Sequence, residues 1–237
     1  DDNEFETEKV SLGCPDVLKL KLNEQPEEFM DYLNHIWAFD VFKITDEDLL
    51  RNEMYRTENR RKDELQNFES YDKFIESLEI EVGINPLSNE DLDRALQLTM
   101  RTNQFNLNGI RKTEAELLKS MANPKAVNWI IEVRDRFGDY GKVGLVLAHE
   151  NGTQLKIDTF LLSCRVLGRH VEETILEKLN GYCLINGLQT IVANFIQTEK
   201  NIPFSDFLHR TGWELDNSGS AYTLNIKIRD QVNATIK

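Results

Sequence analysis

The middle of the chain contains three apolar segments of strand length that are separated only by short polar turns. They cover residues 127–133, 142–148 and 155–164, and the turn between the second and the third contains Asn151-Gly152. An Asn-Gly pair is the typical turn of a β-hairpin, because both residues adopt positive φ readily. The pattern therefore predicts an antiparallel meander of three strands.

A helix and another strand follow the meander, which makes the predicted sheet mixed. Residues 171–186 repeat apolar side chains at helical spacing and end in an Asn-Gly pair, a common helix stop. Residues 188–196 are typical of a strand that is buried on both faces. A short helix at residues 203–209 and an alternating strand at residues 221–228 complete the pattern. We predict an α/β (α+β) fold with a central mixed, mostly antiparallel sheet.

Residues 1–45 have the pattern of the end of an α/β unit. Residues 17–22 alternate apolar and basic side chains, which is the period of a half-exposed strand. A helix is expected after Pro26, because proline and the acidic residues that follow it are favoured at a helix N-terminus. This region is predicted to be separate from the rest of the chain.

Residues 46–84 are predicted to form a helical connector. The charged run at residues 59–64 is interpreted as a solvent-exposed helix face, with a ligand-binding basic patch as the alternative. The segment 83–87 contains glycine and proline and is expected to break the chain. A separate α/β domain at residues 85–237 follows, and its first helix starts with a capping pattern at Ser88.

The overall charge excludes several classes of partner. The chain has 28 basic and 41 acidic residues and a formal net charge of −13. This balance argues against a general nucleic-acid binder and against an anionic membrane surface, because both require clustered basic side chains. No apolar run reaches the length of about 18 residues that a membrane span needs. The widely spaced Cys14, Cys164 and Cys183 form no metal-ligand cluster, which favours a reducing, cytoplasmic setting.

The joint between the third strand and the following helix is the strongest candidate for a binding site. It reads Arg165-Val166-Leu167-Gly168-Arg169-His170. A turn that opens a helix offers unpaired N–H groups and the positive end of the helix dipole. Gly168 permits close approach to the backbone, and the two arginines can add phosphate contacts. The joint suits a pyrophosphate or phosphopantetheine group. The alternative is an ordinary helix N-terminus with two solvent-facing arginines.

Cys164 is a candidate nucleophile, because it lies next to an arginine and a helix N-terminus, which both favour the thiolate. The alternative is a small structural side chain. Strand alternation puts Cys164 on the same face as Phe160 and Leu162, and we expect it to be buried with them and inert. Asp158 and His209 are candidate bases.

Several strings resemble known proteins. The loop at residues 165–169 resembles the Arg/Gln-x-x-Gly-x-Gly/Ala loop of the GNAT acyltransferase superfamily, although His170 stands where that superfamily usually has Gly or Ala. The resemblance covers roughly residues 88–228. It implies a GNAT-like fold in which Asn194 and Asn201 help to complete a cleft for coenzyme A or phosphopantetheine.

Longer strings resemble a more specific family, the FkbH-like proteins. The strings lie at residues 1–3, 35–40, 101–106, 133–141 and 160–169. FkbH-like proteins join a HAD-type phosphatase domain to a GNAT-like domain and are associated with methoxymalonyl–acyl carrier protein biosynthesis for polyketides. Their activity removes phosphate from a three-carbon glyceryl donor and passes the glyceryl unit to a carrier-protein thiol. The resemblance therefore implies a transferase whose partner is an acyl carrier protein.

The resemblances also imply roles for two acidic residues at the start of the sequence and for three amide side chains at residues 103–106. Asp1 and Asp2 match the late acidic motif of the HAD domain, whose carboxylates help to hold Mg²⁺. No Asp-x-Asp nucleophile precedes them, so the chain looks like the C-terminal part of such a protein and is expected to lack phosphatase activity. The amides of Asn103, Gln104 and Asn106 lie where many GNAT folds contact the acceptor substrate, with turn formation as the alternative.

Arg136 lies in a polar loop that could line the same cleft or form an internal ion pair. Two functions stay open. The first is acyl transfer from a carrier-protein or coenzyme A thioester. The second is a non-catalytic module that binds the carrier protein and its phosphopantetheine arm. The second is favoured by His170 and by Leu208, which stands near the place where many N-acetyltransferases have a tyrosine acid.

Overall fold

The computed structural model describes residues 4–14, 17, 19, 28–34, 51–216 and 221–226. The chain divides into two compact units, Asp1–Ile44 and Thr45–Lys237.

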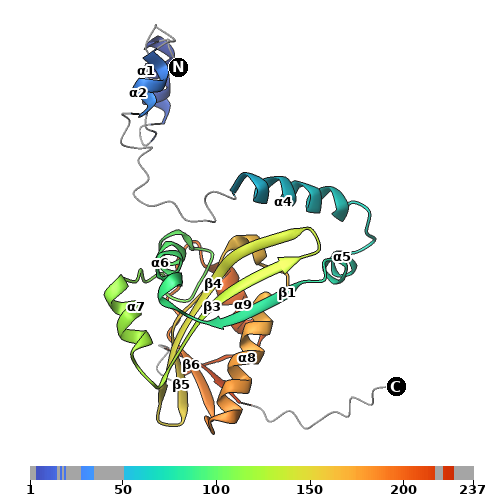
Figure 1. Cartoon of the computed structure of the whole chain (residues 1–237), viewed down its shortest axis with the longest axis vertical. Helices are drawn as coiled ribbons and strands as arrows, with labels where there is room; N and C mark the ends of the chain where they lie inside the picture. Colours follow the sequence, from blue (N-terminus) through green and yellow to red (C-terminus); the bar gives the residue numbers. More distant parts are fainter. Residues whose placement is uncertain are drawn as a thin grey trace. The chain divides into compact units, whose positions relative to one another are not determined.

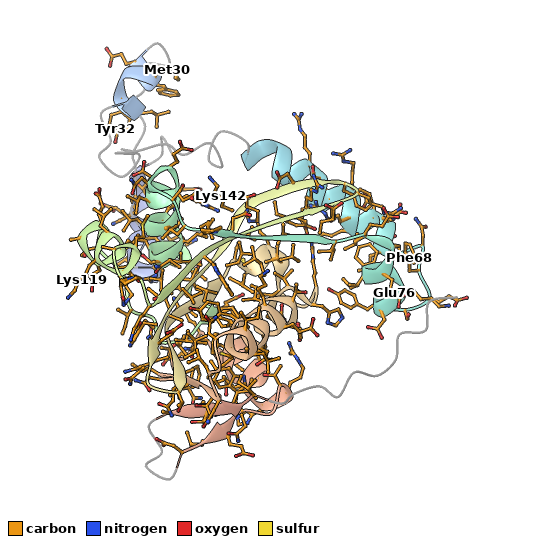
Figure 2. All side chains as sticks on the ribbon, turned by 60° about the horizontal axis from the view of Figure 1, so that its bottom comes forward. Met30, Tyr32, Phe68, Glu76, Lys119 and Lys142 are labelled. Atoms are coloured by element: carbon orange, nitrogen blue, oxygen red, sulfur yellow. The ribbon has the colours of Figure 1, made fainter. Side chains whose placement is uncertain are left out.

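The first unit contains helices α1 (Glu4–Gly13) and α2 (Phe29–Asn34). Met30 of α2 is largely exposed, and Figure 2 shows its side chain. The strand predicted at residues 17–22 and the predicted magnesium ligands Asp1 and Asp2 fall outside the described residues. The metal site therefore stays a prediction.

The second unit is built on an eight-stranded mixed sheet (Figure 1). Its strands are β1 (Glu81–Pro86), β2 (Phe105–Asn106), β3 (Ala126–Asp135), β4 (Gly138–Asn151), β5 (Gln154–Leu162), β6 (Thr190–Ala193), β7 (Glu214–Leu215) and β8 (Tyr222–Asn225). The strand order is β1-β3-β4-β5-β6-β8-β7, and β2 pairs with β5 beside this path. Among the described strands, β5 and β6 form the one parallel pair. The predicted α/β fold with a mixed, mostly antiparallel sheet is confirmed.

Helices cover both faces of this sheet. They are α4 (Arg51–Leu65), α5 (Tyr71–Ser77), α6 (Leu92–Arg101), α7 (Glu114–Met121), α8 (Val171–Ile185) and α9 (Ile202–Arg210), with 3-10 turns at Asn89–Asp91 and Cys164–Val166. Apolar side chains of α8 and α9 form one core with the sheet, those of α6 and α7 form a second, and Phe74, Ile75 and Leu78 form a smaller third cluster. In the described part of the chain no helix is long and apolar enough to cross a membrane.

Local signals explain several of these elements. The predicted meander forms β3, β4 and β5, and Gly152 in the β4–β5 turn has a φ of +62°. Before α6, the N–H and the hydroxyl of Ser88 donate to one carboxylate oxygen of Asp91 at 2.8 and 2.6 Å, as the capping pattern predicts. Asp91 also pairs with Lys142 of β4 at 2.8 Å, which ties the start of α6 to the sheet.

The predicted break at residues 83–87 is wrong, because this segment belongs to strand β1. Strand β1 pairs antiparallel with β3, from Glu81 opposite Arg134 to Pro86 opposite Trp129. Proline is tolerated there because it ends an edge strand, where its missing N–H costs little. The sheet therefore starts at Glu81, inside the segment that the sequence pattern assigns to the connector.

The interpretation of residues 59–64 as a solvent-exposed face is wrong at Arg61. Its guanidinium forms a two-pronged ion pair with Asp135, with Nε–Oδ2 and Nη2–Oδ1 distances of 2.7 and 2.8 Å. The two side chains are only 4% and 0% exposed. The Tyr140 hydroxyl donates to Asp135 at 2.6 Å, and the Arg61 guanidinium lies 4.0 Å from the centre of the Tyr140 ring. This pair fastens α4 to the β3–β4 hairpin.

Replacing Arg61 with alanine should therefore destabilise the protein strongly. The change leaves the Asp135 carboxylate buried without its cation, which costs about 3–5 kcal/mol in comparable cases. The matched control is Arg134→Ala, which removes the exposed pair between Arg134 and Glu81 and should cost about 0–1 kcal/mol. Urea unfolding followed by circular dichroism measures both. Equal costs for the two variants would contradict the anchoring role of Arg61.

Candidate functional site

Strands β5 and β6 diverge halfway along β5. Their parallel pairing ends at Ile157 and Ala193. At the same place the register between β4 and β5 shifts, so that Ile157 and Thr159 face consecutive residues of β4 and Asp158 is left over. A bulge of this kind bends a strand and changes the direction of a side chain. The second half of β5 thus leaves β6, with Asp158 at the point of divergence.

The chain's own strand β2 pairs with the diverging half of β5. Phe105 and Asn106 pair antiparallel with its end, and the Leu107 N–H donates to the Phe160 carbonyl at 3.0 Å. On the other side, the Ile196 N–H donates to the Leu107 carbonyl at 3.1 Å. The Phe105 ring is buried among other phenylalanines at centroid distances of 4.6–5.3 Å. The free edge of β5 is therefore occupied.

Two of the predicted site residues, Asn106 and Asn201, hold this arrangement together. Asn201 Nδ2 donates to the carbonyls of Asn106 and Ile196 at 3.0 and 2.9 Å, and Asn201 Oδ1 accepts from the Thr198 N–H at 2.7 Å. The Asn106 side chain bonds to the Thr102 carbonyl and to the Gly109 N–H, both at 2.9 Å. Both asparagines are buried. The polar side-chain atoms of both asparagines bond to backbone groups.

A histidine–aspartate pair lies at the point of divergence. His149 Nδ1 lies 2.6 Å from Asp158 Oδ2, and the two side chains are 33% and 40% exposed. Asn108 Nδ2 donates to the Asp158 carbonyl at 3.2 Å and fixes the bulge. His149 follows Leu145 and Leu147 at alternate positions of β4, so it shares the sheet face that α6 and α7 cover. The pair combines a base with a group that can orient it.

The predicted base Asp158 thus lies in a dyad, and its partner His149 does not follow from the motifs. The register of the β4–β5 hairpin is the feature of the sequence from which His149 could be predicted. The Asn151-Gly152 turn pairs Asn151 with Gln154, which places His149 opposite Lys156 and two residues from Asp158. The other predicted base, His209, is exposed on α9, and its ring centre lies 6.2 Å from that of Tyr222.

The predicted phosphate loop is held by α4 and α5. Arg169 is only 10% exposed; its Nη2 lies 3.4 Å from Glu58 of α4, and its guanidinium lies 5.0 Å from the Tyr140 ring centre. The Tyr71 hydroxyl donates to the Gly168 carbonyl at 3.4 Å. The interpretation of both arginines as solvent-facing is therefore wrong for Arg169. Its Nη1 is buried and has no hydrogen-bond partner among the described residues.

The rest of the loop is placed differently. Arg165 Nε donates to the Ser163 hydroxyl at 3.2 Å, Val166 is buried and Leu167 packs partly against the core. Gly168 and His170 both have positive φ, +72° and +62°, and the His170 side chain points largely into solvent.

Three further predicted site residues, Asn194, Gln104 and Arg136, belong neither to the His149–Asp158 pair nor to the phosphate loop. Asn194 and Gln104 are exposed. Arg136 Nη2 lies 2.9 Å from Glu64 of α4, so Arg136 forms an ion pair with the connector. In the described residues no group of three or more His, Cys, Asp and Glu side chains is placed to hold a metal.

Glu172 puts a buried carboxylate in the first turn of α8. Burial raises the pKa of this carboxyl above its usual range, and the neighbouring Glu173 adds to the rise, although Arg210 and the N–H groups of Glu172 and Gly168 act against it. Glu172 Oε1 lies 3.2 Å from Arg210 Nη2. A carboxyl group of the chain itself therefore lies at the N-terminus of α8.

The variant Glu172→Gln should gain stability relative to the wild type as the pH rises. The pKa of Glu172 is higher in the folded than in the unfolded chain, so the folded state holds more protons above the ordinary value of 4.5 and stability falls through that window. Urea unfolding at about pH 4 and about pH 7 measures the difference.

The control for this test has the opposite sign. Hydrogen bonds from Thr113 lower the pKa of Glu116, so Glu116→Gln should lose stability relative to the wild type over the same rise in pH. A difference in stability between Glu172→Gln and the wild type that stays constant from about pH 4 to about pH 7 would contradict the raised pKa of Glu172.

The expectation that Cys164 is buried is wrong. Strand β5 ends at Leu162, and the chain turns into the 3-10 helix Cys164–Val166, so strand alternation no longer applies. Cys164 is exposed, as is Cys14, whereas Cys183 is buried in α8. Burial also raises the pKa of the Cys183 thiol to about 11.

Iodoacetamide at about pH 8 should therefore alkylate Cys14 and Cys164 in the folded protein and leave Cys183 unmodified. Mass spectrometry of peptides after a short reaction measures each site, and the same reaction in denaturant should modify all three cysteines. Equal labelling of Cys164 and Cys183 in the folded protein would show that the end of β5 is placed differently.

A pocket of about 370 Å³ lies beside the segment that carries β2. Its lining residues are Asn103, Gly109, Arg111, Thr198, Glu199, Lys200 and Asn201. The pocket brings together the predicted residues Asn103 and Asn201, although Asn201 uses its polar atoms on the backbone.

Comparisons with known proteins give similarities to solved structures. No family model matches the chain, and no curated protein matches it. One similar structure is the ribosomal-protein-S18-alanine N-acetyltransferase of Escherichia coli, at 11% identity and a TM-score of 0.47, over 65% of this chain and 99% of that one. The PaiA N-acetyltransferase of Thermoplasma acidophilum, in complex with coenzyme A, is 14% identical, with a TM-score of 0.48 over 62% of this chain and 99% of that one. A GNAT-family acetyltransferase of Staphylococcus aureus is 11% identical, with a TM-score of 0.49 over 62% of this chain and 100% of that one.

Proposed function

We propose that the second unit is a GNAT-like acyltransferase domain. It transfers an acyl group from a phosphopantetheine thioester, on an acyl carrier protein or on coenzyme A, to a nucleophile. The observation that carries this proposal is the His149–Asp158 pair at the point where β5 and β6 diverge. The FkbH-like strings in the sequence support the carrier protein as partner and a glyceryl-type acyl group in extender-unit biosynthesis.

The pair can act as a general base. With Nδ1–H donating to Asp158, the Nε2 of His149 keeps its lone pair and accepts a proton from the attacking hydroxyl, thiol or amine. The nucleophile forms a bond to the thioester carbonyl carbon, and the C–S bond breaks. The proton then passes from His149 to the leaving thiolate. Asp158 stabilises the imidazolium that exists between the two proton transfers.

The residues fit the donor in part. The buried, unpartnered Nη1 of Arg169 fits a phosphate oxygen beside the turn into α8. The buried carboxyl group of Glu172 opposes a phosphate at the N-terminus of α8, and the pairing of β2 with β5 opposes a pantetheine arm along the strand edge. Acyl transfer at His149 therefore requires β2 to leave β5 when a thioester arm binds.

The occupied edge of β5 favours the second candidate function. A domain whose strand edge stays filled by β2 would act as a non-catalytic module that docks the carrier protein. In that case the His149–Asp158 pair only stabilises the bulge. The two functions differ in what a His149 variant does.

The variant His149→Ala should lower kcat/KM for acyl transfer by about 10²–10⁴-fold, because it removes the general base. The measurement is thiol release from acetyl-coenzyme A and from an acetylated carrier protein, with glycerol and amines as acceptors. Added imidazole should restore part of the lost rate, which a purely structural histidine would not allow.

Two comparisons make this test specific. Asp158→Asn should also slow the reaction, because an amide no longer selects the tautomer with a free Nε2. Lys119→Gln, an exposed change on α7, should leave the rate unchanged. An unchanged rate in His149→Ala, or a wild type without thiol release, would remove the catalytic proposal in favour of the docking module.

A further inference from the structure

Two short segments form the walls of the 370 Å³ pocket, and both are fixed without any ligand. One contains Asn103, Gly109 and Arg111, and the other is Thr198–Asn201. The bond from Asn201 Nδ2 to the Asn106 carbonyl, 3.0 Å long, ties the second segment to the first. A wall that is already ordered loses little conformational freedom when a ligand binds.

Internal bonds use the pocket's neutral acceptors. Asn103 Oδ1 accepts from Arg111 Nη2 at 2.8 Å, and Asn201 Oδ1 accepts from the Thr198 N–H at 2.7 Å. The Thr198 hydroxyl oxygen accepts from the N–H groups of Lys200 and Asn201 at 3.3 and 3.2 Å.

Donors remain in excess. Arg111 has five N–H groups, of which Nη1 donates to the Thr99 carbonyl and Nη2 to Asn103. The Lys200 ammonium has three N–H groups and the Asn103 amide has two. Two cations face one carboxylate, that of Glu199, in a chain whose net charge is −13. The pocket is therefore locally positive and rich in donors on an acidic protein.

We propose that this pocket binds a small anion through Arg111 and Lys200. The ligand class is a small molecule that carries a carboxylate or a phosphate, because both groups offer only acceptors and a negative charge. A volume of about 370 Å³ lies within the range of small-molecule sites.

The pocket shares a segment with the dyad but does not include it. Gly109 lines the pocket, and the preceding Asn108 donates to the Asp158 carbonyl at 3.2 Å. The lining contains neither His149 nor Asp158. Anion binding therefore does not rest on the acyltransferase proposal, and each can fail without the other.

Titration of the full ¹⁵N-labelled chain by NMR tests the site. The probes are sodium lactate and sodium phosphate, with sodium chloride at matched ionic strength as the control for general charge effects. The expected result is a saturable shift of the Gly109, Arg111 and Thr198–Asn201 amides with at least one probe. Lactate alone identifies a carboxylate site, phosphate alone a phosphate site, and both a general anion site.

Variants decide whether the two cations are responsible. Lys200→Gln should weaken binding at least tenfold, about 1.4 kcal/mol, and Arg111→Gln should do the same. Lys200 makes no side-chain bond in the pocket, so its variant keeps the fold if Arg111→Gln does not. Lys119→Gln is the matched control, because Lys119, labelled in Figure 2, is exposed on α7. The pocket lining does not contain it.

Shifts no larger than those with sodium chloride would overturn the proposal, as would equal affinity in the wild type and Lys200→Gln. Binding that persists in His149→Ala, together with a lost or absent transferase activity, would leave the anion site standing alone.

Discussion

The divergence of β5 and β6 is the constraint on which the rest of the second unit depends. Two strands that separate leave unpaired backbone groups inside the protein, and each of these is costly when buried. The chain fills this gap with β2 and the residue after it, Leu107, which bonds to Phe160 of β5 on one side and to Ile196 on the other. Asn201 closes the arrangement. The bulge at Asp158 lies where the divergence starts, and it places Asp158 next to His149. One backbone irregularity therefore accompanies both the gap that β2 fills and the dyad.

A second network of contacts joins helices α4 and α5 to the predicted phosphate loop at residues 165–170. The pair Arg61–Asp135 fixes α4 on the β3–β4 hairpin, and the Tyr140 ring lies close to the guanidinium groups of both Arg61 and Arg169. Glu58 of the same helix faces Arg169. Helices that the sequence pattern assigns to a connector therefore belong to the packing of the loop before α8. A substitution at Glu58 or Arg61 of α4 is therefore expected to alter the position of Arg169, because Glu58 and Tyr140 contact both arginines.

The sequence predicts those parts of the fold that depend on local patterns. The meander, the Asn-Gly turn, α8 and the Ser88 cap follow from periodicity and turn chemistry. Edge strand β1 does not, because Gly83 and Pro86 are also typical of a break. The burial of Arg61 does not either, because its partner Asp135 lies 74 residues further along the chain.

Individual site residues are harder to predict, because their roles depend on long-range packing. Asn106 and Asn201 are predicted as site residues, and their side chains bond to the backbone; Cys164 is exposed because β5 ends two residues earlier. The sequence motifs predict Asp158 as a base, whereas its partner His149 follows only from the residue-by-residue register of the β4–β5 hairpin. Pattern and resemblance give the residue types, whereas pairing between strands decides which of them meet.

We propose that the divergence of β5 and β6 is a reaction centre that a thioester arm can reach. An NMR titration of the full chain with a non-hydrolysable thioether analogue of acetyl-coenzyme A tests this, observing the His149 ring nitrogens and the Leu107 and Ile196 amides. We expect saturable shifts at all three positions, because the arm displaces β2 and reaches the dyad. Saturation of the analogue elsewhere, with His149 and β2 unchanged, would contradict it.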